Sequence, residues 1–351
     1  MMGGVYPLDN HALFTRPTPD QVTPPPSLHW IVPFAASLSE PCQHALPRLA
    51  DAKALPHLRR LLSQLQEVAR IEGDEYALSM PHERVLAAAM GWPDQDGLLP
   101  WAAWWAEQDG VKLTAEAHWG LLSPGHWLMG RDHLTLLDPA TLALSEAESR
   151  ALFEAVRSLF ESDGWTLIWG ASQRWYASHP SLQDLPTASL DRVIGRNPDV
   201  WLTDHPQART LRRLQSEVQM LLYQHPINDT REQAGLATVN SFWLSGCGPV
   251  PACTATPDHI QLVNDLRAPL LADDMAAWLD AWAQVDNNVL KQALQAMDAG
   301  KTIALTLCGE RHAVTLATAP APGLGGRMWQ SVKRLTSSRS GPDPVALLNS
   351  L

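Results

Sequence analysis

The chain has 351 residues, of which 45% are hydrophobic and 18% are charged, and its formal net charge is -11. This length and apolar content suffice for a packed core in two or three domains and exclude intrinsic disorder. The 37 acidic residues outnumber the 26 basic ones, which disfavours nucleic-acid binding by phosphate neutralisation. No uncharged apolar run reaches the ~18 residues that a membrane span needs. We therefore expect neither nucleic acid nor a membrane as a partner.

The cysteines and the N-terminus predict a protein of a reducing compartment. The chain has only 4 Cys, and their spacing is not that of a disulfide framework. No basic segment followed by an apolar one opens the chain, so we expect no signal peptide and a cytoplasmic location. Cys247 and Cys253 lie near His259, but their separation does not fit a common zinc site. We therefore predict no metal site there, and we expect the 15 Trp residues mainly to fill the core.

The first third of the chain predicts an extended tail, one strand and several helices. Residues 1–26 are Pro-rich, which excludes helix and central strand. The apolar run at 28–34 is typical of a buried strand, and helical spacing of apolar residues predicts a helix over 55–68. A second helix is expected over 81–90, and a third should begin near Trp101.

The middle of the chain alternates short strands with helices. Strands are expected near Leu121, Leu128 and residues 134–137, with turns at 123–125 and 130–132. Further elements are predicted in chain order: a helix from Ser145 with Glu148 completing a capping box, a strand over 165–169, and a long helix over 208–225. The last third predicts helices over 275–282 and 289–297, then a hairpin of 302–307 with 312–316.

The densest polar cluster lies between His225 and Pro251. Asn228 and Arg231 are three residues apart and would project from one side of a helical turn. The planar fork of Arg231 suits a phosphate or a carboxylate, whereas the glycines at 246 and 248 allow close approach of a ligand or a tight turn. From the chemistry alone, the alternative is that Asn228, Arg231 and Asn240 satisfy buried loop carbonyls.

This segment resembles the archaeal-type, cofactor-independent phosphoglycerate mutases, which carry H-P-V-N-x-x-R, a glycine, then A-N and W-x-W-G-x-G-x-x-P. The matching residues are His225, Pro226, Asn228, Arg231, Gly235, Asn240, Trp243, Gly246, Gly248 and Pro251. Upstream, Gly170, Ser172 and Arg174 match a G-x-S-x-R segment of the same insert domain. The resemblance implies a small phosphorylated or carboxylate ligand gripped by Arg174, Asn228 and Arg231. His225 and Asn240 would orient the loop, and Gly246 and Gly248 would line the site.

The metal-binding half of that family is not matched. Those enzymes resemble alkaline phosphatases and use two metal ions and a serine nucleophile. Their first strand ends in a metal-binding Asp, whereas the strand here ends in Pro33-Phe34-Ala35-Ala36. The serine position is occupied by His82, followed by Glu83. The resemblance therefore implies a non-catalytic protein without cofactor, since two-metal chemistry needs several carboxylates and histidines.

A closer resemblance over most of 27–330 is to the RpfE-type bacterial regulatory proteins. They share the P-H-E start at Pro81, the P-W-A-A segment at Pro100, and the E-x-Q-M-L-x-x-H-P-x-N run from Glu217 to Asn228. The fold implied is α/β, with a degenerate phosphomutase (alkaline-phosphatase-like) core and an inserted α+β domain. The expected divisions are a tail (1–26), a reduced core segment (27–110), an insert-like domain (111–255) and a helical and hairpin region (256–351).

Two other functions remain open. His82 at the serine position could accept a phosphoryl group with Glu83 as base, in a phosphoglycerate mutase-like isomerase that uses Mn or Mg. Alternatively, exposed Trp104, Trp105 or Trp127 would anchor a protein partner.

Overall fold

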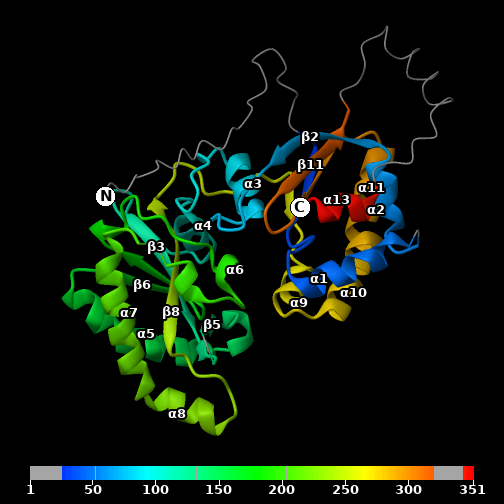
Figure 1. Ribbon diagram of the computed structural model, residues 1–351. Coiled ribbons are helices and arrows are strands. Elements are labelled where there is room, and N and C mark those ends of the chain that lie inside the picture. The colour runs from blue at the N-terminus through cyan, green and yellow to red at the C-terminus, as the bar shows by residue number, and fades with distance from the viewer. Residues whose placement is uncertain (1–25, 52, 132, 203, 320–342) are drawn as a thin grey trace, which may run out of the picture. The chain divides into compact units, whose positions relative to one another are not determined.

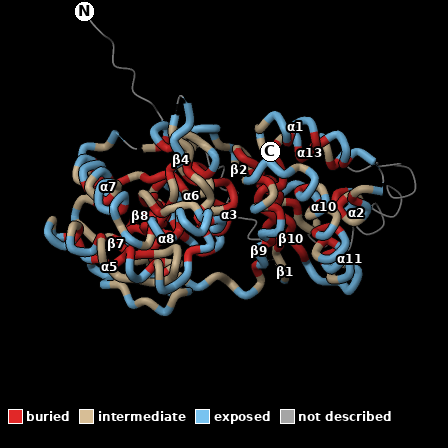
Figure 2. The backbone as a smooth tube through the Cα atoms, turned by 90° about the horizontal axis from the view of Figure 1, so that it is seen from below, coloured by how far each residue is buried: buried red, intermediate tan, exposed pale blue. Residues whose placement is uncertain are grey.

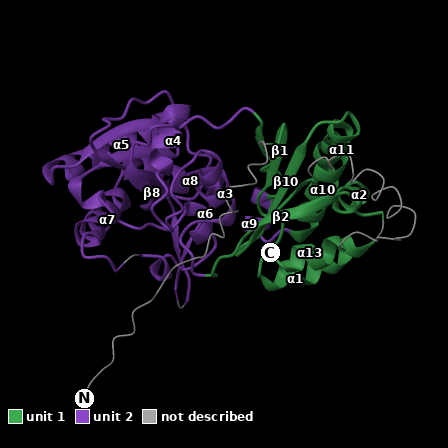
Figure 3. Ribbon diagram, turned by 90° about the horizontal axis from the view of Figure 1, so that it is seen from above, with its two compact units in different colours: residues 1–75, 259–266, 275–351 green, residues 76–258, 267–274 purple. Residues whose placement is uncertain are grey.

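The computed structural model describes residues 26–319 and 343–351, except 52, 132 and 203. The chain folds into two compact units (Figures 1 and 3). Unit 1 is built from the described parts of 1–75, 259–266 and 275–351, and unit 2 from 76–258 and 267–274. Unit 2 is thus inserted into the chain of unit 1. Apart from residue 26, the Pro-rich segment lies outside the described residues.

Unit 1 is built on a five-stranded sheet with the order β2-β11-β10-β1-β9. The strands are β1 (Leu28–Val32), β2 (Leu65–Ile71), β9 (Ile260–Leu262), β10 (Ile303–Cys308) and β11 (Ala313–Thr318). Strand β1 runs parallel to both β10 and β9, whereas β11 is antiparallel to β10 and to β2. The predicted hairpin is therefore confirmed as β10 and β11, and its strand β10 pairs with β1, the first predicted strand.

The two faces of this sheet differ in character. One row of paired residues is Trp30, Leu305 and Leu316, all nearly inaccessible to solvent. The next residues along these strands, Ile31, Thr306 and Thr315, form a paired row on the other face. There the Thr306 hydroxyl lies 2.7 Å from His29 Nε2 and 2.8 Å from the Thr315 hydroxyl. Alternation along the strands produces this difference, because successive side chains point to opposite faces.

The helices of unit 1 lie beside the sheet (Figure 1). They are α1 (Glu40–Ala45), α2 (Pro56–Leu62), α10 (Met275–Val285), α11 (Lys291–Asp298) and α13 (Pro344–Asn349), with a π-helical turn at Asp286–Leu290. Asp286 is fully buried and accepts bonds from the backbone N–H groups of His57 and Leu58 and from His57 Nδ1. This carboxylate therefore caps α2, whose own N-cap position is a leucine that offers no acceptor.

Unit 2 is built on an antiparallel sheet with the order β6-β7-β3-β8. The strands are β3 (His118–Gly125), β6 (Thr166–Ala171), β7 (Arg174–Ser178) and β8 (Ser241–Pro249), and β4 (Trp127–Met129) pairs separately with β5 (Leu134–Leu136). The helices are α3 (Pro81–Ala89), α4 (Trp101–Gln108), α5 (Glu146–Ser162), α6 (Leu190–Val193), α7 (Ala208–Tyr223), α8 (Pro226–Gln233) and α9 (Arg267–Leu271).

Helices cover both faces of the sheet in unit 2. Leu122, Trp175 and Phe242 form a core with the apolar stripes of α5 and α7. On the opposite face, Trp119 and Tyr176 pack in a second cluster with alanines of α4. The buried residues accordingly follow the strands (Figure 2). The amphipathic pattern predicted for α5 and α7 is what directs them to the sheet.

Two local predictions are wrong. The helix expected over 55–68 ends at Leu62, and Leu65–Ile71 is strand β2, because pairing with β11 overrides the helical spacing of the apolar residues. The turn expected at 123–125 continues strand β3. Pro124 is accommodated there because this end of β3 pairs with β8 alone, so the missing N–H interrupts no ladder on the other side.

The α/β class is confirmed, with one unit inserted into the other. The division of the chain differs from the expected one, since residues 76–110 pack in unit 2 and not with the core segment. The reason is that α4 covers the β3–β8 sheet. Within the described residues, no helix is long and apolar enough to cross a membrane.

Candidate functional site

The predicted ligand-binding cluster begins where helix α7 ends and α8 starts. His225 is the N-cap of α8, and its Nδ1 accepts a bond from the Ile227 N–H. Asn228 is 4% exposed and uses both ends of its amide. Its Nδ2 donates to the carbonyls of Leu222 and Val239 at 2.8 Å, and its Oδ1 accepts from the Val239 N–H at 2.9 Å. Asn228 therefore ties the end of α7 to the chain that leads into β8.

Arg231 is 1% exposed, and each nitrogen of its guanidinium group has an acceptor within the chain. Its Nε donates to the Ala237 carbonyl at 2.8 Å, Nη1 to Glu148 Oε1 at 2.8 Å, and Nη2 to the Leu142 carbonyl at 2.5 Å. Glu148 in turn accepts from Ser145 in the predicted capping box at the start of α5. Partial burial acts to raise the pKa of Glu148, but the bonds from Ser145 and Arg231 outweigh it and hold that pKa below its usual value.

Arg174 and Asn240 are likewise engaged by neighbouring groups. Arg174 forms a paired bond with Asp109 at 2.8 and 2.6 Å and lies over the Trp105 ring, 4.6 Å from its centroid. The Asn240 amide binds the N–H and the carbonyl of Trp127 at 2.7 and 3.0 Å. Arg174 contacts the α4 side of the sheet, whereas Arg231 contacts the start of α5, so the structure does not bring the two arginines to one site.

The two glycines of the motif permit α4 to approach strand β8. Gly246 has a φ of +64°, and a Cβ there would lie 2.9 Å from the Ala102 nitrogen. A Cβ on Gly248 would lie 2.9 Å from the Pro100 Cβ. Both glycines therefore lie against helix α4 or its N-cap residue, and protein atoms fill the space that a ligand would need.

His82 and Glu83 begin helix α3 in a buried polar environment. Glu83 Oε2 accepts from the Met80 N–H at 2.9 Å, and Oε1 accepts from the Ser189 hydroxyl at 2.8 Å. Burial raises the pKa of Glu83 to about 7, against the opposing effect of these two bonds. Burial lowers the pKa of His82 to about 4, and His82 Nε2 lies 3.9 Å from Asp191 Oδ2. The imidazole is neutral and 8% exposed, which restricts access of a substrate to it.

An ion-pair network lies beside His82 that sequence analysis did not predict. Arg267 in α9 donates to Asp191 Oδ1 from Nε at 2.9 Å and from Nη2 at 2.5 Å, and to Asp138 Oδ2 from Nη1 at 2.9 Å. The three residues are more than 50 positions apart in the chain, so no spacing could reveal them. Their contacts hold α9 to α6 and to the N-cap of the turn at Pro139–Leu142.

The residues at the ends of the parallel strands in unit 1 do not fit the two-metal centre of the alkaline phosphatases. Phe34, Ala35 and Ala36 follow β1 and are all buried. The nearby Glu310 carboxylate accepts from the Ser37 hydroxyl at 3.1 Å and the Leu38 N–H at 2.8 Å, so it serves the loop. Among the residues that the structure describes, no group of three or more His, Cys, Asp or Glu side chains is placed to hold a metal.

The proposed tryptophan surface is also absent from the described part of the chain. None of the described Trp residues belongs to the exposed large hydrophobic residues, and Trp127 is 7% exposed. Trp104 is half-buried and its Nε1 donates to the Thr256 hydroxyl at 3.1 Å, whereas Trp105 lies under Arg174. The expectation that Trp127 is exposed is wrong, because it packs against Trp243.

No protein-family model matches the chain, and no curated protein matches it significantly. The solved structures that are similar to it include the following two. The cofactor-independent phosphoglycerate mutase from Thermoplasma acidophilum DSM 1728 is 14% identical with a TM-score of 0.35, over 84% of this chain and 90% of that one. The PH0037 protein from Pyrococcus horikoshii is 10% identical with a TM-score of 0.45, over 85% and 89%. Similarity at this level carries no argument about activity, and the α/β class is established by the strands and helices themselves.

Proposed function

We propose that the chain is a non-catalytic phosphomutase-like protein, related to the RpfE-type regulatory proteins, that acts by binding and not by turnover. The observation that carries this proposal is the apolar end of strand β1. In open α/β sheets, ligands and catalytic groups gather at the carboxyl ends of parallel strands. Here that position is filled by the buried side chain of Phe34 and two alanines.

The chemistry of the remaining groups supports the same proposal. Two-metal phosphoryl transfer requires several carboxylates and imidazoles around the ions. Glu310, which lies near the end of β10, is already bonded to Ser37 and Leu38. His82, which takes the serine position in the resemblance, is buried next to Asp191.

The ligand implied by the resemblance is a small phosphorylated or carboxylate anion. We infer that such an anion, where one binds, does not contact Arg174 or Arg231 as the family motif would require. To reach either guanidinium group, it would have to displace the carboxylate of Asp109 or Glu148. The geometry therefore favours an architectural role for the motif.

Turnover assays test the proposal. Interconversion of 2- and 3-phosphoglycerate and hydrolysis of p-nitrophenyl phosphate should be followed with Mn²⁺ and Mg²⁺ for the wild type and for His82→Gln. We expect both proteins to give the rate of the buffer blank. Turnover that the wild type shows and His82→Gln loses would contradict the proposal and favour phosphotransfer through His82.

A further inference from the structure

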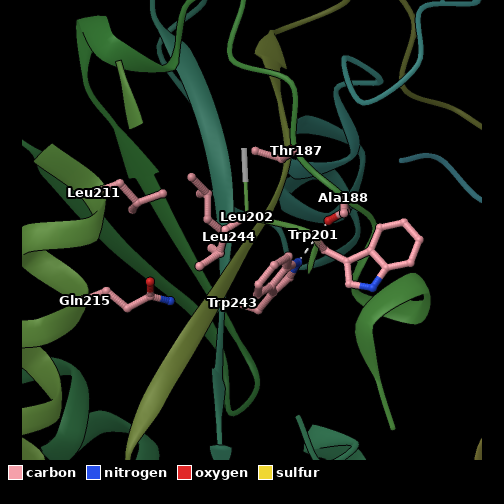
Figure 4. Close-up of a pocket in the computed structure, with 8 residues that line it drawn as sticks. All are labelled: Thr187, Ala188, Trp201, Leu202, Leu211, Gln215, Trp243 and Leu244. Atoms are coloured by element: carbon pink, nitrogen blue, oxygen red, sulfur yellow. Dashed lines mark hydrogen bonds between the residues drawn. The ribbon is translucent and has the colours of Figure 1, made fainter. Parts of the chain in front are cut away.

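The cavity between helix α7 and strand β8 is too small for an organic ligand (Figure 4). Its volume is about 20 Å³, which is room for about one water molecule. The Trp243 indole that lines it is fixed by a bond from Nε1 to the Ala188 carbonyl at 2.9 Å, which Figure 4 draws. A surface that already holds a peptide segment lies instead in unit 1.

Residues 343–351 form a short segment that packs against the rest of unit 1 and contains helix α13 (Figure 1). Three leucines of this segment are nearly inaccessible to solvent, namely Leu347 (8% exposed), Leu348 (1%) and Leu351 (3%). Ala346 and Asn349 are exposed. The segment therefore uses one apolar side for docking and presents the other to solvent.

The docking surface is formed by the turn at Leu46–Ala50, helix α2 and the turn at 309–312 between β10 and β11. A Cβ on Gly309 would lie 2.5 Å from the Leu351 Cβ and 2.8 Å from the Leu351 carbonyl carbon. The missing side chain of Gly309 thus leaves the space that Leu351 fills.

Polar groups of unit 1 hold both ends of the segment. The Leu351 carbonyl accepts from the backbone N–H groups of Arg311 at 3.1 Å and His312 at 2.7 Å. At the other end, Arg59 Nη1 lies 3.5 Å from Asp343 Oδ1. Main-chain donors together with spaces for particular side chains are the usual elements of a peptide-recognition site.

Helix α13 depends on docking for its structure. It has 6 residues, whereas a helix shorter than about 12 residues is marginal in water on its own. In the sequence, residues 320–342 separate the segment from strand β11. No strand of the five-stranded sheet has to open when the segment leaves, because the segment contributes no strand to it.

We propose that this docking surface is a peptide-binding site, and that a partner protein displaces 343–351 from it with a segment of the same pattern. The pattern is an acidic residue, a helical turn with two adjacent leucines, and a third leucine three residues later. A second copy of this chain is not the expected partner, because an identical segment gains no contact over the resident one, which its covalent link keeps near the surface. The proposal does not depend on the absence of catalysis argued above.

The test uses the full chain with its resident segment weakened. Leu348→Asp places a charge at a buried position, whereas Asn349→Asp places the same charge at an exposed one and is the matched control. The probe is a synthetic peptide of residues 343–351, labelled with fluorescein and amidated, and its binding is followed by fluorescence anisotropy. We expect it to bind Leu348→Asp at least tenfold more tightly than the wild type or Asn349→Asp, in which the resident segment competes.

Gly309→Ala in the Leu348→Asp protein shows where the peptide binds. Gly309 does not have a positive φ, so its own backbone tolerates the methyl group, which instead meets Leu351 of the peptide. We expect the peptide to bind this double variant at least tenfold more weakly than Leu348→Asp. The proposal is overturned if the peptide binds Leu348→Asp no better than the wild type, or if Gly309→Ala leaves its affinity unchanged.

Hydrogen exchange of the wild type keeps the test decisive if Leu348→Asp does not fold. The amides of α13 and those of Arg311 and His312 should exchange together, at least tenfold faster than those of Leu305 and Leu307 in β10, because the segment leaves without opening the sheet. Exchange of α13 as slow as that of β10 would overturn the proposal. A wild-type dimer that Leu348→Asp abolishes and Asn349→Asp retains would also overturn it, since the occupant would then be a second copy.

Discussion

At the scale of single residues, the polar side chains of the phosphomutase-like motif serve the backbone. Asn228 saturates its amide with three backbone groups, and Arg231 binds two carbonyls and one carboxylate. The sequence identified these residues as a cluster, and residue chemistry offered both a ligand and loop carbonyls as partners. The sequence could not decide between a ligand and loop carbonyls. Nothing in it shows that the carbonyls of Leu142 and Ala237 are buried and have no other partner.

The pair at the start of α3 predicts an unusual dependence of stability on pH. The pKa of His82 is about 4 in the folded protein, against an ordinary 6.5, so stability falls as the pH drops through this interval. The pKa of Glu83 is about 7, against an ordinary 4.5, so its contribution falls as the pH rises through that interval. Each effect amounts to about 1.4 kcal/mol per pH unit, and between pH 4.5 and 6.5 the two oppose one another.

Substitutions separate the two contributions. We expect His82→Gln to make stability fall more steeply with rising pH than in the wild type, and Glu83→Gln to make it rise with pH, each by about 1 kcal/mol per unit. Urea unfolding of the three proteins at pH 5 and pH 6.5 measures both slopes. Parallel stability curves for all three would show that neither group has a shifted pKa. Asp191 and Arg192, whose charges act on both groups, are unchanged in all three proteins.

At the scale of elements, predictions succeeded where a local signal agreed with the tertiary environment. The capping box of Ser145 and Glu148 and the apolar stripe after it specified α5, and Gly91, with a φ of +76°, lies just beyond α3. The helix expected over 55–68 failed because β2 is exposed along most of its length, so its residues show no strand alternation. Its pairing with β11 is not visible in its own composition.

The close contact of α4 with β8 predicts different costs for two glycine substitutions. Gly235 and Gly246 both have positive φ, but a Cβ on Gly235 meets nothing within 4 Å, whereas one on Gly246 meets Ala102 and Trp101. We expect Gly235→Ala to lower the free energy of unfolding by about 1 kcal/mol from backbone strain alone, and Gly246→Ala by about 3 kcal/mol or more. Chemical denaturation measures both. Equal losses would mean that α4 does not pack against Gly246.

At the scale of the whole molecule, the order of elements follows from one insertion. Strand β1 pairs with β10 and β9, more than 200 residues away in the chain, and unit 2 accounts for most of the intervening segment. The sequence predicted β1 and the β10–β11 hairpin as separate elements. Whether the C-terminal third completes the core sheet could not be decided, because parallel pairing over such a separation leaves no periodic signal.

The same topology explains why the boundaries of the two units differ from the domain boundaries predicted from the sequence. The segment 267–274 returns to unit 2 between two segments of unit 1, and Arg267 fixes it there through Asp138 and Asp191. A change in composition along the sequence indicates a linker between domains. An ion pair between distant segments causes no such change, so composition did not show where segment 267–274 packs. The carboxyl end of β1 was the exception, since the apolar run at 28–34 predicted a buried strand from the sequence alone, and the chain is buried there from Trp30 to Phe34.

The melting temperature of the wild type and of Arg231→Ala, with and without inorganic phosphate or 3-phosphoglycerate, tests most directly whether the motif is architectural. Arg213→Ala, which removes a half-exposed arginine of α7 paired with Asp163, is the matched control. We expect Arg231→Ala to cost about 3–5 kcal/mol without ligand, Arg213→Ala under about 1 kcal/mol, and any shift caused by the anions to be equal in all three. An Arg231→Ala protein that melts with the wild type and loses an anion-induced shift would contradict the account.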